Sequence, residues 1–225
     1  IRPGKDSVGV ITFTGEAKFE QELTSDLEQV RRAIERVEFK PPPPPPGYIG
    51  LPIIVSNPSK LPKISPDQTT LGSTAIWDAI SFASEKVGIQ GSDNPRRVII
   101  LITDGGDTSS KRKLNEAVEA AIKYGVTVYS MGIGDEYYGG TNEDALRKIS
   151  ERTGGRAFFP KKVKDLQPAF VAIEQELRSQ YIISYSPASR KTDNKMRKIK
   201  IEIVNPELRK QDLRLSYQQG YYAKK

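Results

Sequence analysis

The chain has 225 residues, of which 36% are hydrophobic and 28% charged, and no stretch approaches the roughly 18 consecutive apolar residues of a membrane span. It contains no cysteine and no histidine, which excludes Ser-His-Asp triads, cysteine nucleophiles, histidine bases and the usual zinc sites within these residues. A bound metal ion would therefore need oxygen ligands, which favours Mg²⁺, Ca²⁺ or Mn²⁺.

The first part of the chain predicts two strands, a helix and an insertion. A short β-branched run predicts a buried strand over 7–13, and 17–23 suits an edge strand. Ser25 and Glu28 match a capping box, which predicts a helix starting at Ser25. Six consecutive prolines at 41–46 predict a polyproline II rod within a surface insertion over about 40–70. Such a rod can be a docking site or, more commonly, a rigid spacer.

The middle of the chain alternates between helical and strand patterns. Helices are predicted over 74–87, 114–125 and 166–179, with a further helix ending at Gly154–Gly155. Strands are predicted over 96–106, 126–134 and 156–160, and the first of these is apolar on both faces, which is typical of a central parallel strand. The alternation predicts an α/β fold: a doubly wound, mostly parallel, Rossmann-like sheet with helices on both faces.

The C-terminal part has a different pattern and a different charge. Residues 180–186, 196–204 and 212–222 alternate at period two, which predicts an antiparallel β extension. Residues 187–225 carry 11 basic and 4 acidic side chains, so they account for the whole net charge of +7. We therefore expect one domain over 1–180 and a basic β-strand extension over 181–225. A basic segment can bind nucleic acid, anionic lipid or an acidic partner, but a solvated strand face has the same composition.

Two loops place oxygen ligands beyond the expected carboxyl edge of the sheet, where open α/β sheets bind ligands. Thr74 stands at the start of a predicted helix, and Asp104 directly follows the apolar strand. A hydroxyl and a carboxylate from adjacent loops suit a hard divalent cation. Taken alone, Asp104 has a simpler explanation, because acidic residues commonly open the turn after a strand.

The segments GSTAIWDAI (72–80) and RRVIILITDGGDTS (96–109) resemble elements of the von Willebrand factor type A family. In that family three loops form a metal-ion-dependent adhesion site. The resemblance implies that Thr74 and Asp104 ligate Mg²⁺, with Mn²⁺ or Ca²⁺ as alternatives, and that an acidic side chain of a protein partner completes the coordination shell. The rim of this site would include Ser73, Asp107 and Thr108.

The chain departs from the family pattern at its start. The first-loop Asp-x-Ser-x-Ser motif is absent, and the family's first strand, which lies between the strands corresponding to 7–13 and 96–106, is absent as well. A gap at that place would leave two rows of backbone groups unpaired. We expect the strand to come from sequence upstream of residue 1 or from another chain. Alternatively, the metal site is lost and only the scaffold is retained.

The C-terminal segments, which close on GYY, also resemble a bacterial subgroup of this family that is abundant in acidobacteria. Members of that subgroup are generally predicted to be exported, which implies a periplasmic, cell-envelope or secreted location for this chain.

Three functions are consistent with these patterns. The first is a metal-dependent protein-binding or adhesion module. The second is a metal-free structural subunit that contacts partners through the proline-rich insertion and the basic tail. The third is an enzyme, which the absence of Walker-type and dinucleotide-binding motifs disfavours. Nucleic-acid binding has no support beyond the charge of the tail.

Overall fold

The structure is a computed structural model that describes residues 2, 4–14, 16–37, 74–90, 96–103, 106–133, 142–187, 192–211 and 213–223. The chain divides into two compact units, one made of Ile1–Ala79 and Asp107–Lys111, the other of Ile80–Gly106 and Arg112–Lys225. The proline-rich insertion over 40–70 lies outside the described residues. None of the helices in the described ranges is long and apolar enough to cross a membrane.

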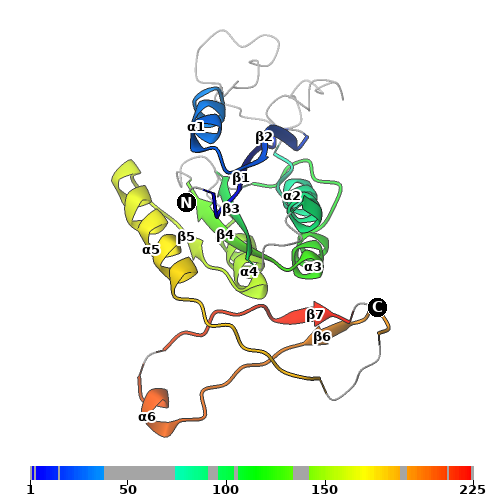
Figure 1. The fold of residues 1–225 in the computed structure, drawn as a ribbon, viewed down its shortest axis with the longest axis vertical. Helices are drawn as coiled ribbons and strands as arrows, with labels where there is room; N and C mark the ends of the chain where they lie inside the picture. The colour runs from blue at the N-terminus through cyan, green and yellow to red at the C-terminus, as the bar shows by residue number, and fades with distance from the viewer. Residues whose placement is uncertain are drawn as a thin grey trace, which may run out of the picture. The chain divides into compact units, whose positions relative to one another are not determined.

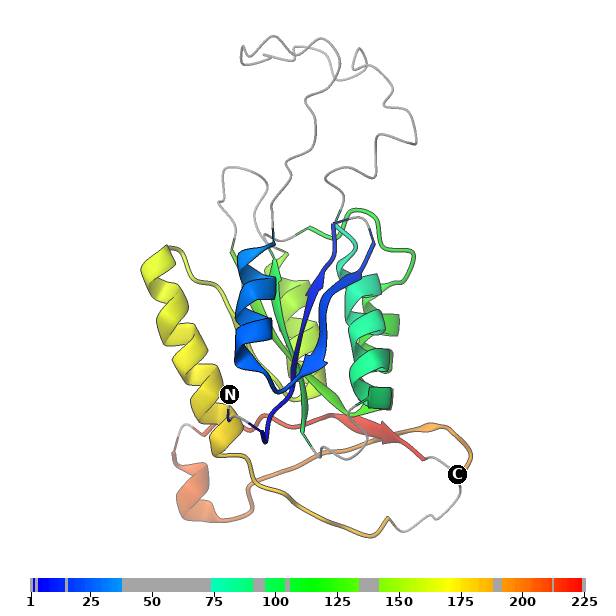
Figure 2. The same ribbon diagram turned by 45° about the horizontal axis from the view of Figure 1, so that its top comes forward.

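The first unit contains a β-hairpin and a helix. Strand β1 (Val8–Thr12) pairs antiparallel with β2 (Lys18–Thr24), and the register shifts twice, between Val8 and Val10 and between Val10 and Ile11. Helix α1 (Leu27–Glu35) lies along this pair, and Figure 2 shows the helix beside both strands. The helical spacing predicts a buried face with Leu27, Val30 and Ile34, but only Val30 is buried, together with Ala33, whereas Leu27 and Ile34 are 36% and 58% exposed.

The start of α1 corrects one prediction. The N-cap is Asp26 and not Ser25, because the Asp26 carboxylate accepts hydrogen bonds from the backbone N–H groups of Glu28 and Gln29, at 2.9 and 3.2 Å. An aspartate at this position satisfies two donors that the first helical turn leaves unpaired, and its charge is favourable at the positive end of the helix.

The second unit contains a parallel sheet in the order β3-β4-β5. Strand β3 (Arg97–Thr103) pairs with β4 (Val126–Gly132) over its whole length, and β4 pairs with the short β5 (Ala157–Phe158). Strand β4 is therefore the central strand of this sheet. Within the described residues β3 is an edge strand, which fits the absence of the family's first strand beside it, and its side chains Ile100 and Ile102 are 43% and 47% exposed.

Helices cover both faces of β4. On one face, Tyr129 and Met131 form a buried cluster with Ala169 and Ile173 of α5 (Leu166–Arg178). On the other, the Ser150 hydroxyl of α4 (Glu143–Thr153) donates a 2.9 Å hydrogen bond to Ser130, and both residues are fully buried. Helix α3 (Leu114–Tyr124) packs beside α4 (Figure 1). This arrangement confirms the doubly wound α/β fold.

Glycines end two of these helices, as the sequence predicts. Gly125 follows α3 with φ of 65°, and Gly154 follows α4 with φ of 89°, both in the left-handed region. Helix α2 (Ile76–Gln90) begins in the first unit and continues into the second.

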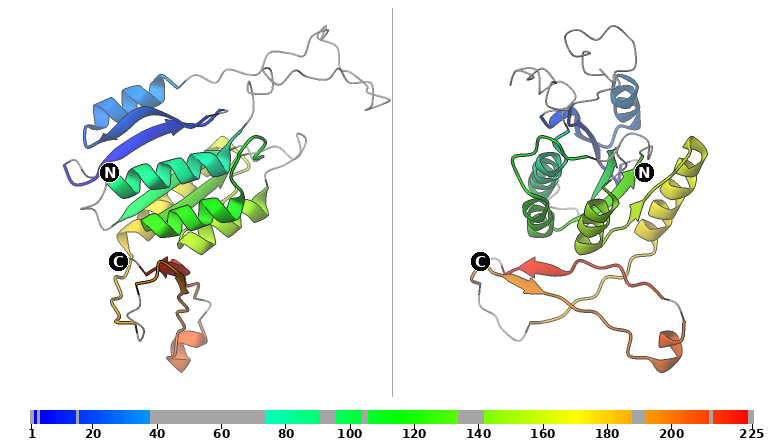
Figure 3. Two further views of the ribbon diagram at one scale, coloured as in Figure 1. Left: turned by 90° about the vertical axis from the view of Figure 1, so that its right-hand side faces the viewer. Right: turned by 180° about the vertical axis from the view of Figure 1, so that it is seen from behind.

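The C-terminal segment forms less regular structure than predicted. Strand β6 (Met196–Lys198) pairs antiparallel with β7 (Gly220–Tyr222), a pairing visible in Figure 3, and a short helix α6 (Pro206–Arg209) lies between them in sequence. The prediction of strands over all of 180–186, 196–204 and 212–222 is wrong, because only these short pieces have a ladder partner. The alternation itself is retained: Ile199, Ile201 and Ile203 are half-buried, and Lys198, Lys200 and Glu202 are exposed.

Candidate functional site

The candidate site begins at Thr74, which directly precedes α2 and is tied to the segment 107–111. The Thr74 backbone N–H donates to the Thr108 hydroxyl at 2.8 Å. In return, the Thr74 carbonyl accepts hydrogen bonds from the backbone N–H groups of Thr108, at 2.9 Å, and Ser109, at 3.3 Å. Thr74 also forms an isolated bridge with Thr14. The position of Thr74 is therefore fixed by backbone contacts on two sides.

Asp107 and Ser110 cap the start of α2 from outside the helix. Asp107 Oδ1 accepts a hydrogen bond from the Ile76 backbone N–H at 2.8 Å and another from the Ser110 hydroxyl at 2.5 Å. The Ser110 hydroxyl oxygen accepts from the backbone N–H groups of Trp77 and Asp78, at 3.0 and 3.2 Å. Three N–H groups that a helix start leaves without intrahelical partners are thus satisfied by residues more than 30 positions away.

The connection is reciprocal, because Asp78 in the first turn of α2 binds the segment in return. Its Oδ2 accepts a 2.9 Å hydrogen bond from the backbone N–H of Lys111. The segment 107–111 is therefore held at both of its ends by α2. Asp107 and Ser110 are half-buried in this arrangement, whereas Thr108 remains exposed.

The structure brings together three of the residues that the sequence singles out, Thr74, Asp107 and Thr108. Asp104 and Ser73 lie outside the described residues. Sequence reasoning missed Ser110 and Asp78. Their signals were a serine-rich stretch after Asp107 and an acidic residue in the first turn of a helix, both of which favour capping.

The described residues do not by themselves fit a divalent cation. They contain no group of three or more acidic side chains that could hold a metal ion. Of the two proposed ligands only Thr74 is described, and one hydroxyl is too few oxygen ligands for Mg²⁺ or Ca²⁺, which take six or more. A metal site here requires Asp104 and further ligands.

Comparison with known protein families gives a match over residues 58–172 to the von Willebrand factor type A domain. This range includes Thr74, Asp104 and the segment 107–111. The chain belongs to the von Willebrand factor type A family. The family resemblance expected from the sequence is thereby confirmed, and von Willebrand factor type A domains generally serve as protein-interaction modules. No curated protein matches the chain.

Solved structures of bacterial proteins have a similar fold. The conserved hypothetical protein BatB from Bacteroides thetaiotaomicron is 22% identical, with a TM-score of 0.53 over 78% of this chain and 81% of that one. An aerotolerance-related membrane protein from Bacteroides fragilis is 22% identical, with a TM-score of 0.51 over 78% and 80%. A von Willebrand factor type A protein from Catenulispora acidiphila is 19% identical, with a TM-score of 0.50 over 73% of this chain and 32% of that one. These likenesses concern the fold alone.

Proposed function

We propose that this von Willebrand factor type A domain is a non-enzymatic binding module that contacts a protein partner at Thr74 and the segment 107–111. The observation that carries this proposal is the set of hydrogen bonds between Thr74, Asp107, Ser110 and the start of α2. They hold two stretches that are distant in sequence in one arrangement before any partner arrives, and such preorganisation lowers the entropic cost of binding. The exposed Thr108 lies on the same segment.

We further propose that binding depends on a divalent cation, Mg²⁺ or alternatively Mn²⁺ or Ca²⁺, with Thr74 and Asp104 among its ligands. A cation in this place would offer an open coordination position to an acidic side chain of the partner. Support comes from the match of Thr74 and Asp104 to the second and third loops of the family's metal site. Ser73, Asp107 and Thr108 would form the rim.

A metal-free scaffold is the second candidate, and two observations favour it. The Asp-x-Ser-x-Ser motif is absent from the sequence, and the Asp107 carboxylate is engaged in capping α2. In this case the partner contacts would come from the proline-rich insertion and the basic C-terminal segment.

Strand β3 supports the proposal that a further strand pairs with this protein. An apolar edge strand of seven residues with no proline or lysine is a template for pairing, and stable proteins normally protect such edges. We propose that the strand comes from sequence upstream of residue 1 or from another chain. We also propose that the protein is exported, to the periplasm, the cell envelope or the medium. The support for this location is the resemblance to a bacterial subgroup that is generally predicted to be exported, together with the likeness to a Bacteroides fragilis protein described as a membrane protein.

Titration calorimetry with Mg²⁺ and Mn²⁺ on the natural protein tests metal dependence. The comparison is between the unaltered protein, Asp104→Ala and Asp107→Asn, the last of which keeps an acceptor for the cap. We expect binding that Asp104→Ala abolishes and Asp107→Asn retains. The intact mass of the same sample records what precedes residue 1. A well-folded protein that binds neither cation would contradict metal dependence and favour the scaffold.

A further inference from the structure

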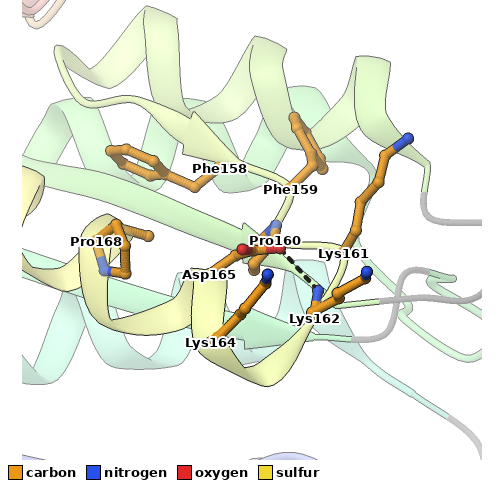
Figure 4. A pocket seen from close by; sticks show the side chains of 9 residues that line it. Phe158, Phe159, Pro160, Lys161, Lys162, Lys164, Asp165 and Pro168 are labelled. Atoms are coloured by element: carbon orange, nitrogen blue, oxygen red, sulfur yellow. Dashed lines mark hydrogen bonds between the residues drawn. The ribbon is translucent and has the colours of Figure 1, made fainter.

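A basic depression lies beyond the carboxyl end of β5, in the second unit. It has a volume of about 540 Å³ and is lined by the chain that leaves β5 and by the first residues of α5 (Figure 4). The chain enters it at Phe158, the last residue of β5, and turns through the 3-10 helix η4 (Val163–Asp165) into α5. Because β5 runs parallel to β4, this is the edge of the sheet at which open α/β folds bind ligands.

Three lysines line one side of this depression: Lys161, Lys162 and Lys164 (Figure 4). All three are exposed, and no ion pair or side-chain hydrogen bond involves their ammonium groups among the residues that the structure describes. Asp165, the one acidic residue of the lining, accepts a 3.0 Å hydrogen bond from the Lys162 backbone N–H. Three positive charges within four residues are therefore left without a counterion from the described residues.

The basic residues just outside the depression, in contrast, are paired with acidic side chains. Arg147 pairs with Glu143 at 3.0 Å, and Arg156 pairs with Glu176 at 3.1 Å. The excess positive charge is thus concentrated on the three lysines, which favours a ligand that carries negative charge.

The rest of the lining, apart from Asp165, is apolar and is called the Phe–Pro floor below. It consists of Phe158, Phe159, Pro160, Pro168 and Ala169. The Arg147 guanidinium lies over the Phe159 ring, 4.5 Å from its centre, and Arg156 lies over Phe158 at 5.0 Å. Each ring therefore already has a cation on one face, which disfavours the stacking by which aromatic side chains bind nucleic-acid bases.

We propose that this depression binds an acidic peptide segment of a partner protein, with an apolar side chain on the Phe–Pro floor and flanking carboxylates near Lys161, Lys162 and Lys164. An apolar centre within a charged rim is the usual composition of a protein-binding patch. Its lining includes neither Thr74 nor any residue of the segment 107–111, so it adds a second contact surface and does not depend on a metal.

Fluorescence anisotropy with a labelled peptide tests the proposal on the full chain. The probe has one leucine flanked on each side by two glutamates, and its controls carry glutamines in place of the glutamates or serine in place of the leucine. We expect the acidic peptide to bind, with an affinity that falls as salt is raised, and both controls to bind more weakly.

Two triple variants locate the site. Replacing Lys161, Lys162 and Lys164 with glutamine should weaken binding of the acidic peptide about tenfold, since each exposed ion pair contributes modestly. The matched control replaces Lys195, Lys198 and Lys200, three exposed lysines of the basic C-terminal segment, and should leave affinity nearly unchanged. Thermal melting checks that both variants are folded.

Several results would overturn the proposal. They are unchanged binding by the first triple variant, equal losses in both, or equal binding of the acidic and glutamine peptides. A fourth is co-sedimentation with vesicles of phosphatidylcholine and phosphatidylserine without any peptide binding, which would identify a membrane surface as the ligand.

Discussion

The carboxylate of Asp107 accepts a 2.8 Å hydrogen bond from the backbone N–H of Ile76, so the cap of α2 comes from a residue 31 positions along the chain. The same oxygen accepts from Ser110, whose own hydroxyl serves Trp77 and Asp78. A helix cap is usually local, and here it also fixes the segment proposed to meet a partner. The stability of the first turn of α2 and the shape of the proposed site are therefore linked.

Removing this cap should destabilise the protein. Asp107→Ala should lower the free energy of unfolding by about 1 kcal/mol, the usual effect of losing an N-cap side chain. Asp107→Asn retains an acceptor and should cost less. A double-mutant cycle with Ser110→Ala, measured by urea denaturation, should give a coupling energy of roughly 0.5 kcal/mol or more. Strict additivity of the two single changes would contradict the shared cap.

Gly154 and Gly125 offer a matched pair, because both end helices in the left-handed region. A Cβ at Gly154 would lie 2.7 Å from the backbone nitrogen of Gln218, whereas a Cβ at Gly125 would meet only the Arg97 guanidinium at 3.6 Å. The backbone near Gln218 is also fixed to α4, since the Gln219 N–H donates to the Arg152 carbonyl at 3.1 Å. The C-terminal segment therefore packs closely on the end of α4.

Alanine substitutions should distinguish the crowded glycine, Gly154, from the uncrowded one, Gly125. Gly125→Ala should cost about 1 kcal/mol of stability, from the left-handed backbone alone. Gly154→Ala should cost roughly 3 kcal/mol, because the backbone at Gln218 must move as well. Equal losses in urea denaturation would indicate that residues 217–219 do not pack on α4 in solution.

The parts of the fold that could be predicted from sequence depend on local signals. The apolar runs of β3 and β4 and the glycines after α3 and α4 required no knowledge of distant residues. The resemblance to the von Willebrand factor type A family also placed Thr74 near Asp107 and Thr108. Choosing Ser25 over Asp26 as the cap of α1 was an error of one residue, between two side chains that both favour that position.

The remaining features depend on long-range partners that the pattern does not contain. The alternation of apolar and polar residues over 180–186 and 196–204 shows that these segments could form strands. A strand forms, however, only where a neighbouring segment pairs with it in register, as at Met196 and Tyr222. Similarly, nothing near Ile76 indicates that Asp107 will cap it. The apolar sequence of β3 correctly predicted a parallel strand, whereas the open edge beside it could be expected only from the strand order of the family.

Tyr129 gives a prediction for alkaline pH. Burial, together with the neighbouring Glu176 carboxylate, raises the pKa of its phenol to about 12. Because the pKa is higher in the folded protein than the usual value near 10, this contribution to stability is complete below pH 10. It is lost as the pH rises from about 10 to 12.

As the pH rises from 9 to 11, the free energy of unfolding of the Tyr129→Phe variant should therefore fall less than that of the unaltered protein. Urea denaturation at each pH measures both. Comparing the two proteins isolates Tyr129, because the other tyrosines are common to both. Parallel pH curves would show that the Tyr129 phenol has an ordinary pKa in the folded state, and that its surroundings are more hydrated than its 1% exposure indicates.

Neighbouring side chains on β3 should respond very differently to substitution. Leu101 is 4% exposed and Ile102 is 47% exposed. Leu101→Ala should lower the free energy of unfolding by about 3 kcal/mol, as cavity-forming changes in a core do. In the 225-residue chain by itself, Ile102→Thr should change it by less than roughly 0.5 kcal/mol. If Ile102→Thr proves as costly as Leu101→Ala, then Ile102 is covered in solution, which is the result expected where a further strand and its connecting helix complete the sheet beside β3.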